Sequence, residues 1–313
     1  MTKTRASPKN TAYLAAMLLP HRAVVLFSAL IALLIAGCSP RRGENELRVV
    51  DWNLEWFPGG KPDSTPDQQA AQMAAAKKAI KKLDPDVLLL QEVRDWAAAT
   101  ELASVVPGLT VHVVSNFGGR PQNQVIAARA AADSAWSAQW RSGPVDPPRG
   151  YTFAALQFPG NRFLLTYSLH LKSNLGEPAR NIALRRESAR QLLAHAKEML
   201  ALYRPRGQCA VLVGGDMNTS LDDPKFAADP TLRAFRLAGF HWTHEGVRFA
   251  KRTTIPGNDT FPDNCFDHIF TLGLGRQTAA VKPFKRISDH NPVILDLDLT
   301  KADFQGELNV ATA

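Results

Sequence analysis

The sequence has 313 residues, of which 45% are hydrophobic and 21% are charged, and it contains three cysteines. These values exclude a disordered chain, a collagen-like chain and a disulfide-rich mini-protein, and they fit one large or two small globular domains. The formal net charge is +8, but the first 37 residues hold four basic residues and no acidic one. The +4 that remains is a mild bias, which is compatible with an anionic substrate but does not establish one.

A leader is predicted at the N-terminus. Residues 23–36 are apolar apart from one serine, and they precede Gly37 and Cys38. This run is shorter than the roughly 20 residues that a membrane-spanning helix needs, and it fits the core of a signal peptide. The segment from Ile35 to Cys38 resembles a bacterial lipobox. We therefore predict a lipoprotein signal peptide over residues 1–37 and a diacylglyceryl lipid with palmitate-type chains on Cys38.

The segment after the leader is predicted to be a short tether. Residues 38–45 have no apolar periodicity, so they are interpreted as the lipidated cysteine and a linker to the folded domain. A lipid anchor implies export to the cell envelope, on the periplasmic or outer-membrane side. Translation from Met17 is an alternative, because residues 1–16 form a long polar preface for a leader. A plain signal anchor with a chance cysteine is the competing interpretation.

Helix and strand patterns alternate from Leu47 onward, as in an α/β domain. Thr65 and Pro66 supply an N-cap and a proline at the first helical position, and Pro85 ends the predicted helix. The apolar run at residues 87–90 is too short for a helix and predicts a buried strand. Further strands are predicted at residues 47–52, 163–169, 210–213, 268–272 and 293–299, and a second helix at residues 180–203. Cys209 and Cys265 are predicted to be free thiols.

Polar clusters stand at the ends of these strands. Carboxylates, amides and imidazoles gathered at a sheet edge are the groups that a hard-cation site and general acid–base catalysis require. Burying each alone would cost several kcal/mol, so they are expected to share partners. The clusters are Asn53 and Glu55, Gln91 and Glu92, His170 to Ser173, Asp216 to Asn218, Asp267 and His268, and Ser288 to Pro292.

The ordered set of these motifs resembles the endonuclease/exonuclease/phosphatase superfamily, the deoxyribonuclease-I-like enzymes. Each motif alone is weak, but six in the right order form a strong signal. The resemblance covers residues 46–300 and leaves residues 301–313 as a C-terminal tail. It implies a four-layer α/β sandwich, in which two mixed β-sheets pack face to face and are flanked by helices.

The resemblance also implies a role for each polar residue. Glu92 would be the principal ligand of Mg²⁺, or of Mn²⁺ in its place, with Asn53, Glu55 and Asp289 near the ion or its waters. Asp216 would deprotonate the attacking water and Asn218 would hold a phosphate oxygen. Asp267 would fix the tautomer of His290, which binds the phosphoryl oxygen or supports the nucleophile, and His170 would protonate the leaving oxygen.

Plainer interpretations compete with these roles. An acid after a strand is often only a helix N-cap. His268 follows Asp267 directly, so it is expected to point to the opposite face of its strand and to be structural. His241 and His244 have no metal-ligand partners nearby in the sequence and are interpreted as ordinary histidines. Trp52 is expected in the core.

The substrate is the least constrained part of the prediction. Lys172 and Arg180 are the preferred contacts to substrate phosphates, with Lys251, Arg252, Lys285 and Arg286 as further candidates, and a solvated rim is the alternative. The preferred function is a metal-dependent phosphodiesterase that hydrolyses nucleic acid as a monomer outside the cytoplasm. One alternative is a phosphodiesterase or phosphatase for phospholipid headgroups or sugar phosphates, as in sphingomyelinases. The other is a binding lipoprotein without catalysis.

Overall fold

The computed structural model describes residues 42–43, 45–118 and 121–309. The predicted leader, Cys38 and most of the predicted tether therefore lie outside the described residues. Within the described part, no helix combines the length and the apolar character needed to cross a membrane. The described residues from Asn45 onward form one compact unit.

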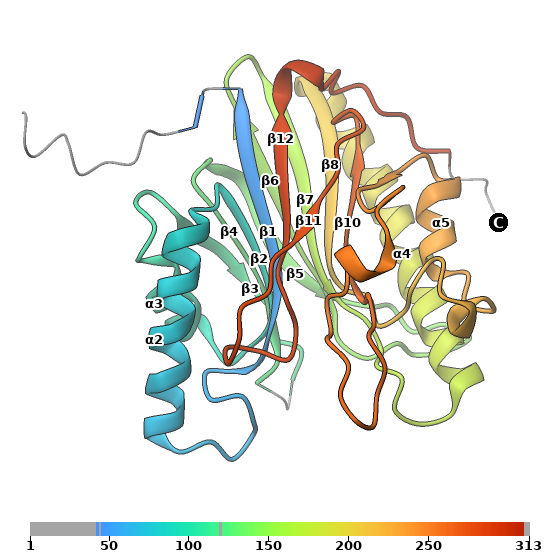
Figure 1. Cartoon of the computed structure of the whole chain (residues 1–313). Coiled ribbons are helices and arrows are strands. Elements are labelled where there is room, and N and C mark those ends of the chain that lie inside the picture. The colour runs from blue at the N-terminus through green and yellow to red at the C-terminus, as the bar shows by residue number, and fades with distance from the viewer. Residues whose placement is uncertain (1–41, 44, 119–120, 310–313) are drawn as a thin grey trace, which may run out of the picture. The chain divides into compact units, whose positions relative to one another are not determined.

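The strands of the described residues form two six-stranded sheets (Figure 1). They are β1 (Glu46–Phe57), β2 (Val87–Val93), β3 (Thr110–Val114), β4 (Asn123–Ala128), β5 (Ala132–Gln139), β6 (Gly150–Phe158), β7 (Arg162–His170), β8 (Gln208–Asp216), β9 (His241–Trp242), β10 (Asp267–Leu272), β11 (Ala280–Val281) and β12 (Val293–Asp298). The first sheet has the order β11-β12-β1-β2-β4-β3 and the second β5-β6-β7-β8-β10-β9. Each contains one parallel pair, β1 with β2 and β7 with β8, among antiparallel pairs. Both sheets are therefore mixed, as predicted.

Helices cover the outer face of each sheet (Figure 1). In the described part they are α2 (Pro66–Leu83), α3 (Trp96–Ala103), α4 (Pro178–Tyr203) and α5 (Thr231–Leu237). Ile80 and Leu102, from α2 and α3, share one buried cluster with β1 and β2. Leu192 and Phe235, from α4 and α5, share another with β7, β8 and β10. The predicted four-layer α/β sandwich is confirmed.

Side chains alternate between the two faces of each strand, and this alternation builds the core between the sheets. Val49 of β1, Leu89 of β2 and Leu212 of β8 are buried together in that core. Their neighbours Val50 and Leu88 instead join the cluster that contains α2 and α3. Burying a side chain of this size contributes about 1.5–3 kcal/mol, so the repeated alternation fixes which face of every strand points inward.

The capping signals of the sequence are confirmed in α2. The Thr65 hydroxyl accepts a hydrogen bond from the backbone N–H of Gln68, and the Gln68 side chain accepts one from the backbone N–H of Thr65. This reciprocal capping box satisfies two of the donors that a helix N-terminus leaves without intrahelical partners. Both cysteines of the described part, Cys209 and Cys265, are free and buried, as expected.

One predicted boundary was wrong. The domain was expected to end at residue 300, but Phe304 is buried in the core between the sheets. Its carbonyl accepts a hydrogen bond from Cys209 N and its N–H donates to the carbonyl of Gly273. Residues 301–309 therefore belong to the domain. The segment has no strand-like alternation, so the sequence pattern did not reveal this packing.

Candidate active site

Strand alternation carries polar side chains into the space between the sheets at one edge. His170 on β7, Asp216 on β8 and Asp267 on β10 each lie an even number of residues from an apolar position of the inter-sheet core. All three therefore face the opposite sheet. In register, Asp216 lies opposite His170 on one neighbouring strand and opposite Asp267 on the other. The pairing of three strands in the second sheet thus brings these three residues side by side.

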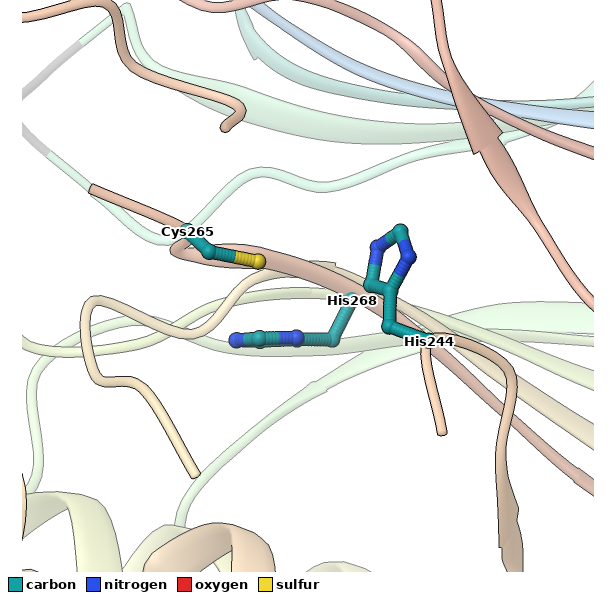
Figure 2. Close-up of side chains that lie close together, drawn as sticks. All are labelled: His244, Cys265 and His268. Carbon is teal, nitrogen blue, oxygen red and sulfur yellow. The ribbon is translucent and has the colours of Figure 1, made fainter. Parts of the chain in front are cut away.

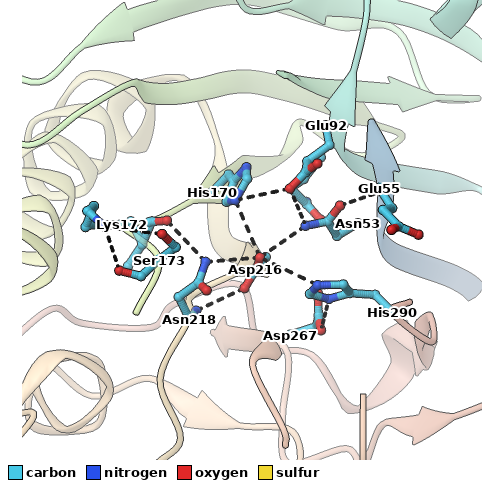
Figure 3. A network of polar contacts seen from close by, with 12 residues as sticks. Asn53, Glu55, Glu92, His170, Lys172, Ser173, Asp216, Asn218, Asp267 and His290 are labelled. Carbon is cyan, nitrogen blue, oxygen red and sulfur yellow. Dashed lines mark hydrogen bonds and ion pairs between the residues drawn. The ribbon is translucent and has the colours of Figure 1, made fainter. Parts of the chain in front are cut away.

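Asp216 lies at the centre of the polar network (Figure 3). Its Oδ2 accepts hydrogen bonds from Asn53 Nδ2 and Asn218 Nδ2, each at 3.1 Å. The Nε2 atoms of His170 and His290 lie 3.5 Å and 4.0 Å from the same oxygen. Five predicted site residues from separate parts of the sequence therefore meet at a single carboxylate.

Carboxylates gather on the side of Asp216 nearest β1 and β2. Glu92 Oε1 accepts a hydrogen bond from Asn53 Nδ2 at 3.3 Å, and its Oε2 accepts one from the backbone N–H of Trp56 at 3.0 Å. Glu55 Oε2 accepts a hydrogen bond from the backbone N–H of Asp289 at 3.1 Å. The four residues predicted as metal ligands, Asn53, Glu55, Glu92 and Asp289, are thus linked directly or through one another.

His290 and Asp267 form a buried ion pair. The Nδ1 atom of His290 lies 3.0 Å and 2.8 Å from the two oxygens of Asp267, which leaves Nε2 facing Asp216. The indole N–H of Trp52 donates to the His290 carbonyl at 2.9 Å. Trp52 is fully buried, as predicted, and it also holds the backbone that carries His290.

Three site residues have strained backbones. Glu55, Glu92 and Asn218 adopt φ values of 51°, 61° and 54°. These values lie in the left-handed region, which residues other than glycine rarely adopt. Strain of this kind costs on the order of 1–3 kcal/mol per residue and persists where the surroundings hold it. Glu55 and Glu92 lie where the register of β1 and β2 shifts, and Asn218 follows the end of β8. The sequence pattern did not predict this geometry.

Burial and neighbouring charges shift the pKa values of several site residues. Burial raises the pKa of Glu55 to about 7, and the charges of Asp289 and Glu92 act in the same direction. Burial likewise raises the pKa of Asp216 to about 7, with a further contribution from Asp267. Burial opposes a charge on His290, but the charge and hydrogen bond of Asp267 outweigh it and hold the pKa of His290 well above its usual value. His290 is therefore a cation at neutral pH.

Burial governs the charge of His170, on which its predicted role as a proton donor depends. Burial lowers its pKa well below the ordinary value, and the positive charges of Arg149 and His290 act in the same direction. The imidazole is therefore neutral at neutral pH, and it is a poor source of a proton for a leaving oxygen. Its Nε2 atom lies 3.7 Å from Glu92 Oε1 and 3.5 Å from Asp216 Oδ2.

The residues around Asp216 and Glu92 fit a divalent cation. Glu55, Glu92, Asp216 and Asp289 present oxygen atoms, which are the ligands that Mg²⁺ prefers. Burial, and then the charges of neighbouring carboxylates, raise the pKa of Glu55 and Asp216, and a bound cation would offset this cost of their negative charges. Asp216, Asp267 and His290 form a second group that could hold an ion. The direct bond between His290 and Asp267 favours an ion pair there.

Two predicted substrate contacts are placed differently by the structure. The Lys172 ammonium donates hydrogen bonds to the carbonyls of Ser173 and Leu175 at 2.8 Å and 2.7 Å. It therefore contacts the backbone of its own loop. Arg252 is buried and paired with both oxygens of Asp222, so its guanidinium already has an anionic partner within the protein. Arg180 is exposed at the start of α4, and its contact with phosphate stays a prediction.

Asp51 and Arg149 were missed by the sequence analysis. Asp51 is fully buried beneath the site and accepts a hydrogen bond from Gln91 Nε2 at 2.9 Å. The same nitrogen donates to Ser168 Oγ at 3.1 Å, which ties the first sheet to the second. Arg149 donates to the carbonyl of Leu171 beside His170. Strand alternation identifies Asp51 as inward-facing, whereas Arg149 follows two prolines in a loop and gave no signal.

Raised carboxyl pKa values predict a pH-dependent effect of Mg²⁺ on stability. Glu55 and Asp216 have ordinary pKa values of 4.5 and 3.8, and the fold raises both to about 7. Because the folded state binds more protons between these limits, the stability of the metal-free protein falls as the pH rises from about 4 to about 7. Saturating Mg²⁺ is therefore expected to raise the melting temperature more at pH 8 than at pH 5.

Differential scanning fluorimetry with and without Mg²⁺ tests this expectation. Glu92→Gln is the matched variant, since it removes one carboxylate charge and keeps the shape of the side chain. It is expected to lose most of the Mg²⁺-dependent rise. An equal rise at both pH values would contradict the assignment of these carboxylates to a cation site.

Residues 52–290 match the model of the Endonuclease/Exonuclease/phosphatase family. No curated protein matches the chain by sequence. Among solved structures, truncated TDP2 from Caenorhabditis elegans is similar with a TM-score of 0.58 and 18% identity, covering 81% of this chain and 98% of that chain. TDP2 from D. rerio in complex with a single-strand DNA product has a TM-score of 0.57 and 18% identity, and the match covers 80% of this chain and 98% of that chain. A mannosyl-6-phosphatase from Bacteroides thetaiotaomicron has a TM-score of 0.55 and 16% identity, and the match covers 80% of this chain and 99% of that chain. These structures share the fold of this chain.

Proposed function

The chain belongs to the endonuclease/exonuclease/phosphatase family, and on that premise we propose that it is a phosphodiesterase that hydrolyses nucleic acid outside the cytoplasm. Members of this family are metal-dependent phosphoric ester hydrolases, and so is this chain. The observation that carries the proposal is the meeting of Asn53, Asn218, His170 and His290 at the Asp216 carboxylate, beside the acidic group around Glu92.

Each residue of the site has its own role in the proposed hydrolysis. Asp216 takes the proton of a water as its oxygen bonds to phosphorus, and a pKa of about 7 suits a base at neutral pH. His290, held as a cation by Asp267, binds a phosphoryl oxygen and supplies the proton to the oxygen that leaves. Asn218 donates to the phosphate. Glu92 would hold Mg²⁺ or Mn²⁺ with Asn53, Glu55 and Asp289, and the ion would neutralise the developing phosphoryl charge.

The exposed cations support a polyanionic substrate. Arg180 at the start of α4, Lys251, and Lys285 and Arg286 before β12 are all exposed in loops or helix ends next to site motifs. Contacts with flanking phosphates would use such side chains. A structure of the same fold binds a single-strand DNA product. A sugar-phosphate monoester is the second candidate, because another structure of the same fold is a mannosyl-6-phosphatase.

A substrate comparison tests the proposal. The full chain is incubated with plasmid DNA, sphingomyelin vesicles, a sugar phosphate and bis(p-nitrophenyl) phosphate, each with Mg²⁺, with Mn²⁺ and with a chelator. We expect DNA to be cleaved only with a metal ion, and Glu92→Gln to lose this cleavage. Cleavage of the lipid or the sugar phosphate without cleavage of DNA would overturn the nucleic-acid assignment.

We also propose that the protein is anchored to the cell envelope as a monomer through a lipid on Cys38. The apolar run before Gly37 and Cys38 supports this proposal. Replacing Cys38 by serine removes the thiol that would carry the lipid. The Cys38→Ser protein is expected to leave the membrane fraction in cell fractionation, with Cys209→Ser as the matched control. Retention of Cys38→Ser in the membrane would count against lipidation.

A further inference from the structure

Another cluster of potential metal ligands lies outside the active site. It consists of His244, Cys265 and His268, whose ligand atoms all lie within 4.8 Å of one another (Figure 2). His244 has no metal-ligand partner close to it in the sequence, but the fold brings Cys265 and His268 next to it. The cluster forms because β9 and β10 pair antiparallel, which brings the turn after β9 against the start of β10.

The cluster faces away from the catalytic centre. His268 follows Asp267 on β10, so the two side chains point to opposite faces of the strand, as predicted. Asp267 faces the other sheet and bonds His290. His268 shares its face with Phe270, which packs in the cluster that contains α4 and α5. Ligands bound by His268 and by Asp267 would therefore be separated by the strand.

His244 is buried without the partners that its polar atoms require. Its side chain is fully buried, and neither ring nitrogen makes a hydrogen bond of good geometry among the described residues. The backbone of Asp267 is a polar neighbour, which acts to raise the pKa of the ring against the effect of burial. Leaving a buried polar group unpaired is costly, and such a group calls for an explanation such as a missing water or ion. Burial holds the pKa of His244 at about 3, so the ring is neutral and offers a lone pair to a metal.

His268 has the hydrogen-bond pattern of an oriented ligand. Its Nε2 lies 2.9 Å from the carbonyl of Thr219. The carbonyl can only accept a hydrogen bond, so Nε2 carries the hydrogen and Nδ1 carries the lone pair. A ligating histidine usually makes the same bond through its second nitrogen. The lone pair of Nδ1 now accepts from the indole N–H of Trp242 at 3.1 Å. A metal would replace this neutral hydrogen bond, which is weak compared with metal ligation.

Cys265 supplies a sulfur atom. It is fully buried, and burial raises the pKa of its thiol to about 12, although the neighbouring Arg252 guanidinium acts in the opposite direction. The charge of Arg252 is itself balanced by Asp222. A metal would displace the thiol proton to solvent and bind the thiolate.

We infer that His244, Cys265 and His268 bind a structural Zn²⁺ ion distinct from the catalytic cation. Two imidazoles and one thiolate suit Zn²⁺, whereas Mg²⁺ prefers oxygen ligands. A water would complete a tetrahedral shell. The ion would fasten β10 to the turn after β9 and so stabilise the strand that carries Asp267.

Co²⁺ as a substitute probe tests the site, because a thiolate ligand gives a sulfur-to-cobalt charge-transfer band that an all-oxygen site cannot give. The full chain is stripped with a chelator and titrated with Co²⁺, and a parallel sample is loaded with Zn²⁺, desalted and analysed for metal. We expect the band to saturate at about one equivalent, and about one Zn²⁺ per chain to be retained. Zn²⁺ is expected to bleach the band and to raise the melting temperature.

Matched variants separate this site from the catalytic one. Cys265→Ser and His244→Gln are expected to lose the band and the retained Zn²⁺. Cys209→Ser removes the other buried cysteine, and Glu92→Gln removes a predicted Mg²⁺ ligand, so both are expected to keep the band. Circular dichroism checks that each variant is folded. Absence of the band in the folded wild-type chain, or its survival in Cys265→Ser, would overturn the inference and leave a buried water as the partner of His244.

Discussion

Replacing Asp216 by asparagine is expected to lower the turnover of phosphodiester hydrolysis by about 10²- to 10⁴-fold, the usual contribution of a positioned general base. Asparagine keeps the shape of the side chain but cannot take a proton from water. The variant is expected to fold, because it removes a buried charge that lies near Asp267 and Glu92 and whose pKa is raised to about 7. Steady-state kinetics with bis(p-nitrophenyl) phosphate and Mg²⁺ measure the loss.

The matched control for this variant is Asp296→Asn. Asp296 makes a surface ion pair with Arg48 and has 59% of its side chain exposed. The same chemical change at that position is expected to leave turnover unchanged. If Asp216→Asn kept near-normal turnover, the assignment of Asp216 as the general base would be wrong, whatever the result for the control.

Replacing His290 by alanine is expected to reduce both turnover and stability. The change removes the cation that meets the phosphate, and it leaves the fully buried Asp267 carboxylate without its ion-pair partner. Breaking a buried pair from one side typically costs about 3–5 kcal/mol. Turnover is expected to fall by at least about 10²-fold, and thermal melting measures the loss of stability.

A double variant separates the two effects of His290. Adding Asp267→Asn to His290→Ala removes the uncompensated charge, so the melting temperature is expected to recover while turnover stays low. Double-mutant cycles of this kind isolate the coupling between two groups in contact. If the double variant recovered turnover along with stability, the loss in His290→Ala would reflect misfolding and not chemistry.

The predicted fold followed from features that act locally or repeat along the chain. The capping residues of α2 and the apolar runs of β2, β7, β8, β10 and β12 predicted these elements within a few residues. Strand alternation then explains why Asp216 and Asp267 face inward and why His268 faces outward. The strands β3 to β6 were not predicted. In β5 most side chains are half-buried, so apolar and polar residues do not alternate clearly there.

The parts of the site that escaped prediction depend on contacts between distant segments. Burial of Arg252 against Asp222 and the neutral state of His170 arise from packing that no local motif encodes. The approach of His244 to Cys265 depends on the pairing of β9 with β10, and β9 has only two residues. The left-handed backbone at Glu92 is also a tertiary effect, because the surrounding structure must hold it.

A crystal of the protein grown with Mn²⁺ would show whether the carboxylates of the site bind a cation, since the anomalous scattering of manganese locates the ion. We expect a peak bound by Glu92 and adjacent to Asn53, Glu55 and Asp289, with carboxylate oxygens at a distance of about 2 Å. No peak at the Glu92 carboxylate under saturating Mn²⁺, or a peak only elsewhere in the chain, would contradict this expectation.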